Sequence, residues 1–381
     1  MSVSTAEQQT TIDSGRKLAR FYYLCCLVVL LLLAVGWSVA TSKDYLNFGT
    51  LWASGRAAAN GLNPYAVYPE THREDYAPFG GPNGVPDLNL NPPCVLPLLQ
   101  LLSHLSIHRF TVVWIAGVWL CLALGITLIF IDRPLLQKRQ ILWLSVSMPP
   151  LLALSFGQVY GPLFLLSAVA LFLYERNKKL LAAVAIGILI SIRPTMAVWP
   201  LFLFITGHRK VAAVAMSIGT VLYALPVALY GEIVYRQWFL ALDNDIHWMS
   251  PANIGFIAVL SRIGFRLAGV ILATAAFCAI AAWVYKYKTG FIATSGAALC
   301  IGILCAPIGW SWYILFAAPF FVARKWDRVE TAAALAFFLP VEFTDKTSGI
   351  PELVAVILVI GVFVFGSKSY KLHLPAKARE P

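Results

Sequence analysis

Residues 16–44 read RKLARFYYLCCLVVLLLLAVGWSVATSKD, a short basic cluster followed by an apolar run from about Phe21 to Ala40. The run approaches the roughly 20 apolar residues that a helix needs to cross a bilayer. Apolar runs near this length recur from Leu18 to the C-terminal tail, separated by short polar breaks. The repetition predicts one continuous helical membrane domain rather than a globular domain with a single anchor, because helices satisfy their own backbone polar groups in lipid.

The composition of the whole chain agrees with this interpretation. Of its 381 residues, 59% are apolar and 12% are charged, and the mean hydropathy is +0.75. Too little polar surface remains to cover soluble domains, which excludes soluble enzyme folds. We therefore predict an all-α, polytopic integral membrane protein with about twelve transmembrane helices.

The net charge of +11 comes from short Lys and Arg clusters that lie between the apolar runs. They form neither a basic helix nor an RNA-binding strand with aromatic residues, so the charge indicates membrane topology rather than nucleic-acid binding.

The seven cysteines show no C-x-x-C spacing. Neither a disulfide framework nor a cysteine metal site is indicated.

The first basic cluster sets the orientation of the chain. Residues Arg16, Lys17 and Arg20 precede the first apolar run, so the positive-inside rule places them in the cytoplasm and brings Thr41 to the outer face. Ser38-Val39-Ala40 resembles a signal-peptide cleavage site. We prefer a retained helix, because the run exceeds the usual signal-peptide length and further spans follow.

The later basic clusters predict hairpins, because each segment between two cytoplasmic clusters must return to the same side. The expected turns lie near Gly157-Gln158 in segment 141–174, near Arg193-Pro194 in segment 180–206, and between Pro307 and Trp312 in segment 290–323. The clusters are Arg133/Lys138/Arg139, Arg176/Lys178/Lys179, Arg209/Lys210, Lys286/Lys288, Arg324/Lys325/Arg328 and the tail from Lys368.

Segment 180–206 has an alternative interpretation as one proline-kinked span with Arg193 in mid-membrane. We prefer the hairpin, because its short arms can end in a protein-lined cavity and the tip would lie recessed below the membrane surface.

Two long stretches, 41–109 and 231–266, are then expected on the outer face. The first contains helix-like segments at 45–60 and 96–105. The second of these is too short and too rich in proline to span, and we expect both helices to lie along the outer interface. This gives a cytoplasmic N-terminal tail at 1–17, a transmembrane domain at 18–366 and a cytoplasmic C-terminal tail at 367–381.

Asp44 is a candidate general base at the membrane boundary, where a carboxylate facing a cleft can take a proton from an attacking hydroxyl. The alternative is an N-cap of the helix that follows.

Arg193 is a candidate phosphate ligand, because its fork of donors suits phosphate oxygens. Its alternatives are an interhelical ion pair or a snorkelling side chain. Gln158, at the neighbouring tip, either binds substrate or satisfies local backbone groups.

Aromatic residues at the third tip, Trp310, Trp312 and Tyr313, are either part of an interfacial belt or a surface that stacks on sugar rings. His247 has no second His or Cys at ligand spacing, so it indicates a loop histidine rather than a metal ligand. We retain it as a candidate substrate-binding residue. Walker A, dinucleotide-binding and zinc-protease motifs are absent from the sequence.

Several short motifs follow one another in a fixed order along most of the chain. Taken together, the sequence resembles glycosyltransferase family 87, the polyprenyl-phosphate-mannose-dependent α-1,2-mannosyltransferases of the GT-C superfamily. The motifs are Asp44-Tyr45, Trp52-Ala53, Arg56-Ala57-Ala58, Gly61-Leu62-Asn63-Pro64-Tyr65, Asn91-Pro92-Pro93, Pro97-Leu98, Gly157-Gln158, Arg193-Pro194 and Pro307-Ile308-Gly309-Trp310.

The resemblance implies that Asp44 is the general base of an inverting displacement and that Arg193 binds the donor phosphate. It also makes Arg56 a candidate substrate-binding residue. The sequence departs from the family at three places. Asn91 replaces a tyrosine, Arg193 replaces a lysine, and Trp312 with Tyr313 stands where a histidine is often found. These departures concern the sugar and the acceptor more than the fold.

We therefore expect a glycosyltransferase of the bacterial inner membrane that moves mannose or another hexose on the outer, periplasmic face. Its expected partners are a polyprenyl-phosphate sugar donor, a lipid or glycan acceptor and membrane lipids, with no nucleic acid, metal or other cofactor. The alternatives are a transporter or lipid-sugar flippase, which should carry charges near the midplane, and a non-catalytic scaffold with small-residue seams.

Overall fold

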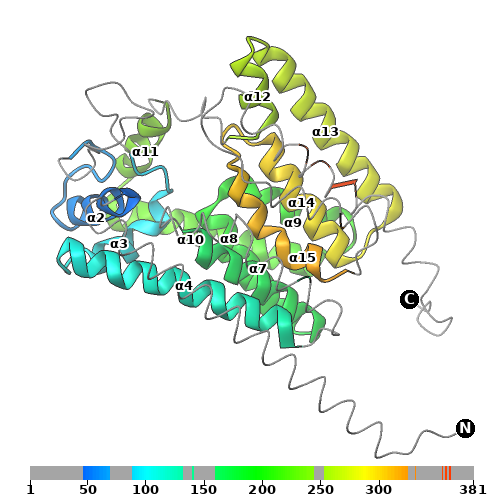
Figure 1. Cartoon of the computed structure of the whole chain (residues 1–381), viewed down its shortest axis with the longest axis horizontal. Coiled ribbons are helices and arrows are strands. Elements are labelled where there is room, and N and C mark those ends of the chain that lie inside the picture. The colour runs from blue at the N-terminus through cyan, green and yellow to red at the C-terminus, as the bar shows by residue number, and fades with distance from the viewer. Residues whose placement is uncertain are drawn as a thin grey trace, which may run out of the picture.

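The structure is a computed structural model, and it describes residues 46–68, 88–131, 159–243 and 253–324, with isolated positions at 140, 331, 354, 357, 360 and 361. Within these residues the regular structure is helical, apart from a single isolated bridge between Asn253 and Trp310 (Figure 1). The predicted all-α class is confirmed for this part of the chain. The first apolar run and both predicted tails lie outside the described residues.

Three described helices are long and apolar enough to cross a membrane: α4 (Ile107–Ile131), α10 (Arg209–Tyr230) and α13 (Arg266–Tyr287). Helix α13 lies at the edge of the bundle in Figure 1 and exposes many large apolar side chains, such as Leu267. Such a surface is suited to lipid. Twelve spans stay a prediction, because much of the expected apolar sequence lies outside the described residues.

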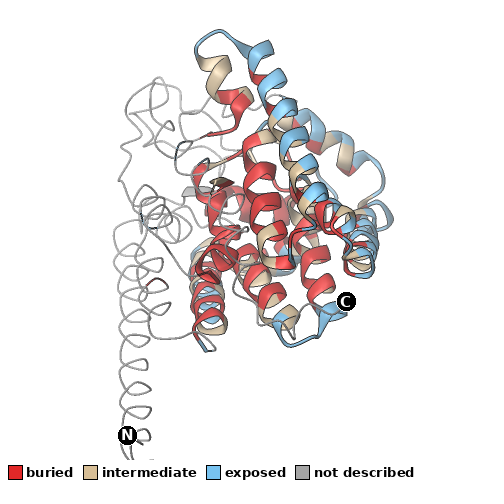
Figure 2. Cartoon of the chain, turned by 90° about the vertical axis from the view of Figure 1, so that its right-hand side faces the viewer, coloured by how far each residue is buried: buried red, intermediate tan, exposed pale blue. Residues whose placement is uncertain are grey.

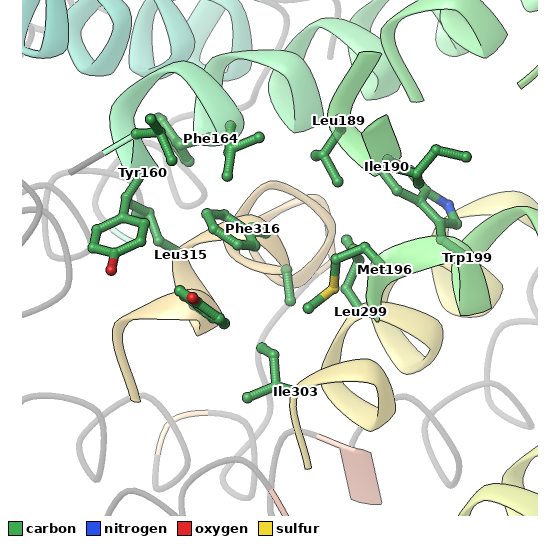
Figure 3. Packing of buried hydrophobic residues seen from close by; sticks show 14 of the residues in the cluster. Tyr160, Phe164, Leu189, Ile190, Met196, Trp199, Leu299, Ile303, Leu315 and Phe316 are labelled. Carbon is green, nitrogen blue, oxygen red and sulfur yellow. The ribbon is translucent and has the colours of Figure 1, made fainter. Parts of the chain in front are cut away.

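The centre of the bundle consists of shorter helices, α7 (Tyr160–Glu175), α8 (Lys179–Ile192), α9 (Val198–Ile205) and α14 (Phe291–Cys305). Nearly every residue of α14 is buried, and the buried ribbon gathers in the middle of the molecule (Figure 2). Figure 3 shows side chains from α7, α8, α14 and the 3-10 helix η5 (Ser311–Phe316) converging in this core.

Glycines allow these helices to approach closely. A Cβ atom at Gly161 would overlap the Val118 carbonyl of α4, and one at Gly187 would overlap the Ala215 carbonyl of α10. Close packing over small residues is typical of membrane helices, which gain little from hydrophobic association in lipid. The contacts at Gly161 and Gly187 show that α7 packs against α4 and that α8 packs against α10.

The chain reverses at Arg193-Pro194, as the hairpin interpretation predicts. Lys179, at the start of α8, places its ammonium over the Tyr174 ring, and the Tyr174 hydroxyl lies 3.2 Å from Nδ1 of His208, just before α10. The start of α8 and the end of α9 therefore lie at the same end of the bundle. The alternative of one kinked span through 180–206 is wrong.

We call this end the basic end, and it also receives the junction between α13 and α14. Nζ of Lys288 donates to the Ile205 carbonyl at 3.1 Å, and Phe291 stacks on Tyr174 with ring centroids 3.6 Å apart. Basic clusters from distant parts of the sequence thus meet on one side. Their cytoplasmic placement stays a prediction from the positive-inside rule.

Segment 290–323 also returns to the basic end. After α14 the chain passes through η5 into α15 (Ala318–Val322), where Phe320 lies 6.0 Å from Phe291 between ring centroids. The predicted turn between Pro307 and Trp312 is confirmed. For segment 141–174, only the arm formed by α7 lies within the described residues, so its turn stays a prediction.

The first predicted outer stretch contains the two expected short helices, α2 (Leu46–Ala59) and α3 (Leu96–Leu102). Gly55 of α2 lies directly against the Leu99 carbonyl of α3, and Trp52 donates its Nε1–H to the Leu105 carbonyl at 2.9 Å. Gly61, with φ of +67°, allows the turn after α2. The second stretch contains α11 (Ile233–Asp243) and α12 (Phe256–Arg262).

Candidate functional site

Arg193 lies at the tip of the 180–206 hairpin because of the proline that follows it. A residue before proline is sterically pushed out of the helical region, and Arg193 has φ −133° and ψ 83°. Its backbone N–H still bonds to the Leu189 carbonyl at 2.9 Å, while its own carbonyl accepts from Met196 at 2.9 Å. Helix α8 therefore ends at this arginine, and the return arm starts immediately.

Two aromatic rings from other segments flank the guanidinium group. Its central carbon lies 5.8 Å from the ring centroid of Tyr160 and 5.1 Å from that of Tyr313. The two rings meet edge to face at 5.4 Å. Arg193, Tyr160 and Tyr313 therefore bring the start of α7, the 180–206 tip and the 307–312 tip to one place, which we call the arginine site.

The electrostatics of the arginine site leave Arg193 available to an external anion. Its Nε–H is buried and has no hydrogen-bond partner, and no ion pair reaches it from the described residues. A buried guanidinium donor without a partner is costly. The interhelical ion pair considered from the sequence is therefore absent from the described part of the chain.

The aromatic wall continues through the third tip. Trp310 and Trp312 are stacked with centroids 4.9 Å apart and an interplanar angle of 10°, and Trp312 lies 6.0 Å from Tyr160. Trp310 is half-buried, whereas Trp312 and Tyr313 are buried. Of the three predicted aromatic residues, Tyr313 therefore lies beside Arg193, while Trp312 and Trp310 continue the aromatic wall from Tyr160. Stacking on a sugar stays a prediction.

The first outer stretch reaches the same site through Cys94, which sequence reasoning did not select. Its thiol donates to the Ser191 carbonyl at 3.0 Å, two residues before Arg193. Burial raises the pKa of the Cys94 thiol to about 12, although Arg193 and the bond to Ser191 act in the opposite direction. Cys94 is thus a neutral thiol that holds the 89–95 segment against the 180–206 tip.

A tyrosine and a tryptophan hold the segment before Cys94 by hydrogen bonds. Tyr65 donates its hydroxyl to the Asn91 carbonyl at 3.1 Å, and Trp238 of α11 donates its Nε1–H to the Leu90 carbonyl at 3.1 Å. Burial is the main reason that the pKa of Tyr65 is raised well above its ordinary value. The two predicted outer stretches are therefore joined across residues 89–91.

Asn253 is a second residue that the sequence did not reveal. It is fully buried, and its Nδ2 donates to the Pro307 carbonyl at 2.9 Å while its Oδ1 accepts the backbone N–H of Gly309 at 2.9 Å and of Gly255 at 3.2 Å. The bonds to Pro307 and Gly309 fasten the 253–255 loop to the tip that carries Trp310, Trp312 and Tyr313, whereas the bond from Gly255 lies within the loop. A single asparagine in a long loop belongs to no sequence pattern that would predict this contact with a distant segment.

The remaining predicted residues are placed differently. Arg56 is exposed on α2 with its guanidinium carbon 4.9 Å from the Trp52 ring centroid, and α2 lies across the molecule from α14 and α15 in Figure 1. Asp44, Gln158 and His247 lie outside the described residues. Among those described, no three His, Cys, Asp or Glu side chains form a group that could hold a metal ion.

Comparison of the chain with curated proteins and with solved structures finds no match. A family comparison does find one, because the sequence profile of glycosyltransferase family 87 matches residues 89–307, more than half of the chain. The matched region includes Asn91, Cys94, Arg193 and Asn253, and it stops at Pro307, just before the aromatic tip. The chain therefore belongs to glycosyltransferase family 87 and is a membrane glycosyltransferase.

Proposed function

We propose that the protein transfers a sugar, mannose or another hexose, from a polyprenyl monophosphate donor to a lipid or glycan acceptor. The observation that carries this proposal is the half-buried Arg193, which has two aromatic neighbours, a buried Nε–H without a partner and no counter-ion among the described residues. A polyprenyl phosphate supplies the missing anion together with an apolar chain that suits the membrane.

The chemistry of the proposed step requires positive charge at the leaving group. The acceptor hydroxyl oxygen attacks the anomeric carbon from the face opposite the phosphate, through an oxocarbenium-like transition state. The bond from the anomeric carbon to the phosphate oxygen breaks, and its electron pair stays on the phosphate. Arg193 neutralises the charge that develops there. The hydroxyl proton passes to Asp44, and the anomeric configuration inverts.

The aromatic residues have a separate part in the proposal. Tyr160, Trp312 and Tyr313 give the arginine site apolar walls, which limit water near the reacting carbon and strengthen the electrostatic attraction of Arg193 for phosphate. Half-buried Trp310 presents a ring on which a sugar could stack. With a phosphate monoester as leaving group, one arginine can supply the charge that a nucleotide diphosphate usually receives from a metal ion.

The proposed orientation follows from the separation of charge along the bundle. Basic clusters meet at the basic end, and the arginine site lies at the opposite ends of α7 and α8. We infer that the basic end faces the cytoplasm and that the arginine site opens toward the outer, periplasmic side of the bacterial inner membrane.

A transfer assay with the purified protein tests the proposal. The reaction would contain a panel of polyprenyl-phosphate sugars and a membrane lipid extract, with nucleotide sugars in parallel. We expect one polyprenyl-phosphate sugar to give a glycosylated product and free polyprenyl phosphate. Transfer from a nucleotide sugar alone, or movement of the lipid-linked sugar across a vesicle membrane without transfer, would contradict it.

A further inference from the structure

Two buried asparagines in the 88–91 loop form an amide pair. Asn89 and Asn91 are 3% and 4% exposed. Oδ1 of Asn89 accepts both the backbone N–H of Asn91 and the Nδ2–H of Asn91, each at 3.0 Å. The pair is therefore held together by two hydrogen bonds that converge on one oxygen.

These bonds fix which way each amide points. A backbone N–H can only donate, so the Asn89 atom that it contacts must be the oxygen. That oxygen in turn requires the nitrogen of Asn91 to face it. Two amide atoms take no part in these bonds, and we call them the outer atoms. They are the Nδ2 donor of Asn89 and the Oδ1 acceptor of Asn91, whichever way the amides are first assigned.

Both outer atoms are buried and have no hydrogen-bond partner among the described residues. The backbone around them is well satisfied, because Trp238 bonds the Leu90 carbonyl and Tyr65 bonds the Asn91 carbonyl. The unpaired groups are therefore confined to the two amides. A buried donor and a buried acceptor left open together are costly, and such a cost is typical of a site whose partner is a ligand.

We propose that the Asn89–Asn91 pair binds a hydroxyl group of a sugar substrate. One hydroxyl can donate to Oδ1 of Asn91 and accept from Nδ2 of Asn89, so a single group satisfies both open positions. A phosphate or carboxylate would satisfy only the donor and would repel the carboxamide oxygen. This inference deepens the proposed function and rests on it, because it supplies the sugar subsite of the same transfer reaction.

The position of the pair relative to Arg193 agrees with such a subsite. Asn91 precedes Cys94 by three residues, and Cys94 bonds to Ser191 beside Arg193. Trp238 and Tyr65, which are themselves buried, bond to the same loop and hold it in place. The loop that carries the amide pair is therefore fastened to the tip that carries Arg193.

Two substitutions separate binding from folding. Asn89→Asp keeps the oxygen that accepts both bonds from Asn91 and replaces only the open donor. Asn91→Leu removes the open acceptor together with the Nδ2–H that donates to Asn89, while the backbone N–H of Asn91 still donates to Oδ1 of Asn89. If the pair serves substrate, the melting temperature of the unliganded Asn91→Leu protein should change little, because removing an unpaired buried acceptor offsets the loss of one hydrogen bond.

Asn63→Asp is the matched control. Oδ1 of Asn63 accepts the backbone N–H of Tyr65 at 2.9 Å, the same two-residue turn that Asn89 makes with Asn91. An aspartate keeps this bond, and we expect the control to leave transfer kinetics unchanged. A loss in Asn89→Asp alone would therefore not be a general effect of a new carboxylate in the outer loop.

Kinetics of purified variants distinguish the donor sugar from the acceptor sugar as the source of the hydroxyl. We expect Asn89→Asp and Asn91→Leu to raise the KM for one of the two substrates, the sugar donor or the acceptor, by about tenfold. A rise confined to the KM for the polyprenyl-phosphate sugar assigns the pair to the donor. A rise confined to the acceptor KM assigns it to the acceptor.

A binding measurement keeps the test independent of turnover. Alkyl glycosides with different sugars, compared with an alkyl alcohol of the same chain length, should raise the melting temperature of the wild type more than that of Asn89→Asp or Asn91→Leu. An equal shift in wild type and variants, or unchanged KM values in an active enzyme, would overturn the subsite. A wild type that binds glycosides through this pair but transfers no sugar would contradict the proposed function alone.

Discussion

Arg193 combines two properties that a single residue rarely has in a membrane bundle. It is held rigidly, because its backbone both ends α8 and starts the return arm, and its guanidinium is bracketed by two tyrosine rings. Its Nε–H nevertheless has no partner within the described residues. A rigid but unsatisfied cation is the arrangement expected of a preorganised anion site.

The proposed base is tested by Asp44→Asn. Asparagine remains a good N-cap, so the variant should fold and insert normally while transfer falls by roughly 10²–10⁴-fold, as expected when a general base is lost. Expression level, melting temperature and transfer rate on one preparation would check this. Near-normal transfer would assign Asp44 to helix capping only.

His208 predicts a pH dependence of stability. Burial, with Lys179 as a second cause, lowers the pKa of His208, which lies between α9 and α10. The folded state then favours the neutral imidazole. Stability from this group is fully present above the ordinary pKa of about 6.5 and is lost as the pH falls below it.

Melting temperatures between pH 8 and pH 5.5 measure this effect. We expect the wild type to lose stability toward the acid end and His208→Gln to lose less. His104→Gln, which replaces an exposed histidine, serves as the control and should behave like the wild type. An identical pH profile for wild type and His208→Gln would contradict the assignment.

At the scale of elements, the hairpins place the site. Each arm of 180–206 is short, with α8 packed on α7 and α10 and α9 packed on α10 and α14. The tip at Arg193 meets the start of α7 at Tyr160 and the 307–312 tip at Tyr313. Three segments that are distant in sequence therefore form one site, because the start of α7 and the turns of the other two segments lie at the same end of the bundle.

The hairpin turns were predictable because their signals are local. A proline after Arg193 ends the helix, and flanking basic clusters require both arms to return to one side. The short helices at α2 and α3 were similarly predictable from length and proline placement. Asp44 could be selected only as a candidate base, because an N-cap and a general base require the same residue type at that position.

Other parts of the site depend on contacts that no local pattern encodes. Asn253 acts through two bonds to the distant 307–309 segment and one within its own loop, and Asn89 is significant only because its donor is buried without a partner among the described residues. The ring neighbours of Arg193 depend in the same way on how α7 and η5 pack. Such features follow from tertiary packing, which one sequence does not specify residue by residue.

The link between Asn253 and the aromatic tip predicts a positioning role. Asn253→Ala would leave the Pro307 carbonyl and the Gly309 N–H without their partner and cost about 1–3 kcal/mol of stability. Because the tip carries Tyr313, we also expect kcat to fall by about tenfold or more at temperatures where the protein is fully folded. The fluorescence of Trp310 and Trp312 should shift as the tip loosens.

Asn60→Ala is a suitable comparison for this variant. Asn60 is exposed, and its side chain donates to the carbonyl of Arg56 in the preceding helix at 2.9 Å. The Asn60→Ala variant should keep its activity, and its free energy of unfolding should change only by the small amount usual for a surface substitution. Normal kcat in a destabilised Asn253→Ala protein would limit Asn253 to a structural role.

For the whole molecule, the separation of the basic end from the arginine site implies one orientation in the membrane. Lys178, Lys210 and Lys286 belong to the clusters that the fold brings to the basic end, whereas Leu62 and Glu232 lie in the two predicted outer stretches. An active site on the outer face requires these two groups to be on opposite sides of the membrane.

Single cysteines on a cysteine-free background test the orientation in intact cells. Cysteines at Leu62 and Glu232, both exposed, should react with a membrane-impermeant maleimide, and cysteines at Lys178 and Lys210 should react only after permeabilisation. Labelling of Lys178→Cys or Lys210→Cys from outside would reverse the proposed topology. Labelling at all four sites would indicate leaky cells and call for a cytoplasmic control protein.

The central claim is that Arg193 neutralises the phosphate released from a lipid-linked sugar donor, and single-turnover transfer rates of Arg193→Ala and Arg193→Lys test it most directly. We expect Arg193→Ala to lose roughly 10²–10³-fold in rate. Arg193→Lys should retain at least about tenfold more activity than alanine, because a point charge still neutralises phosphate although the two-donor fork is lost. Melting temperatures of the same preparations exclude misfolding. Full single-turnover activity in a folded Arg193→Ala protein would contradict the account.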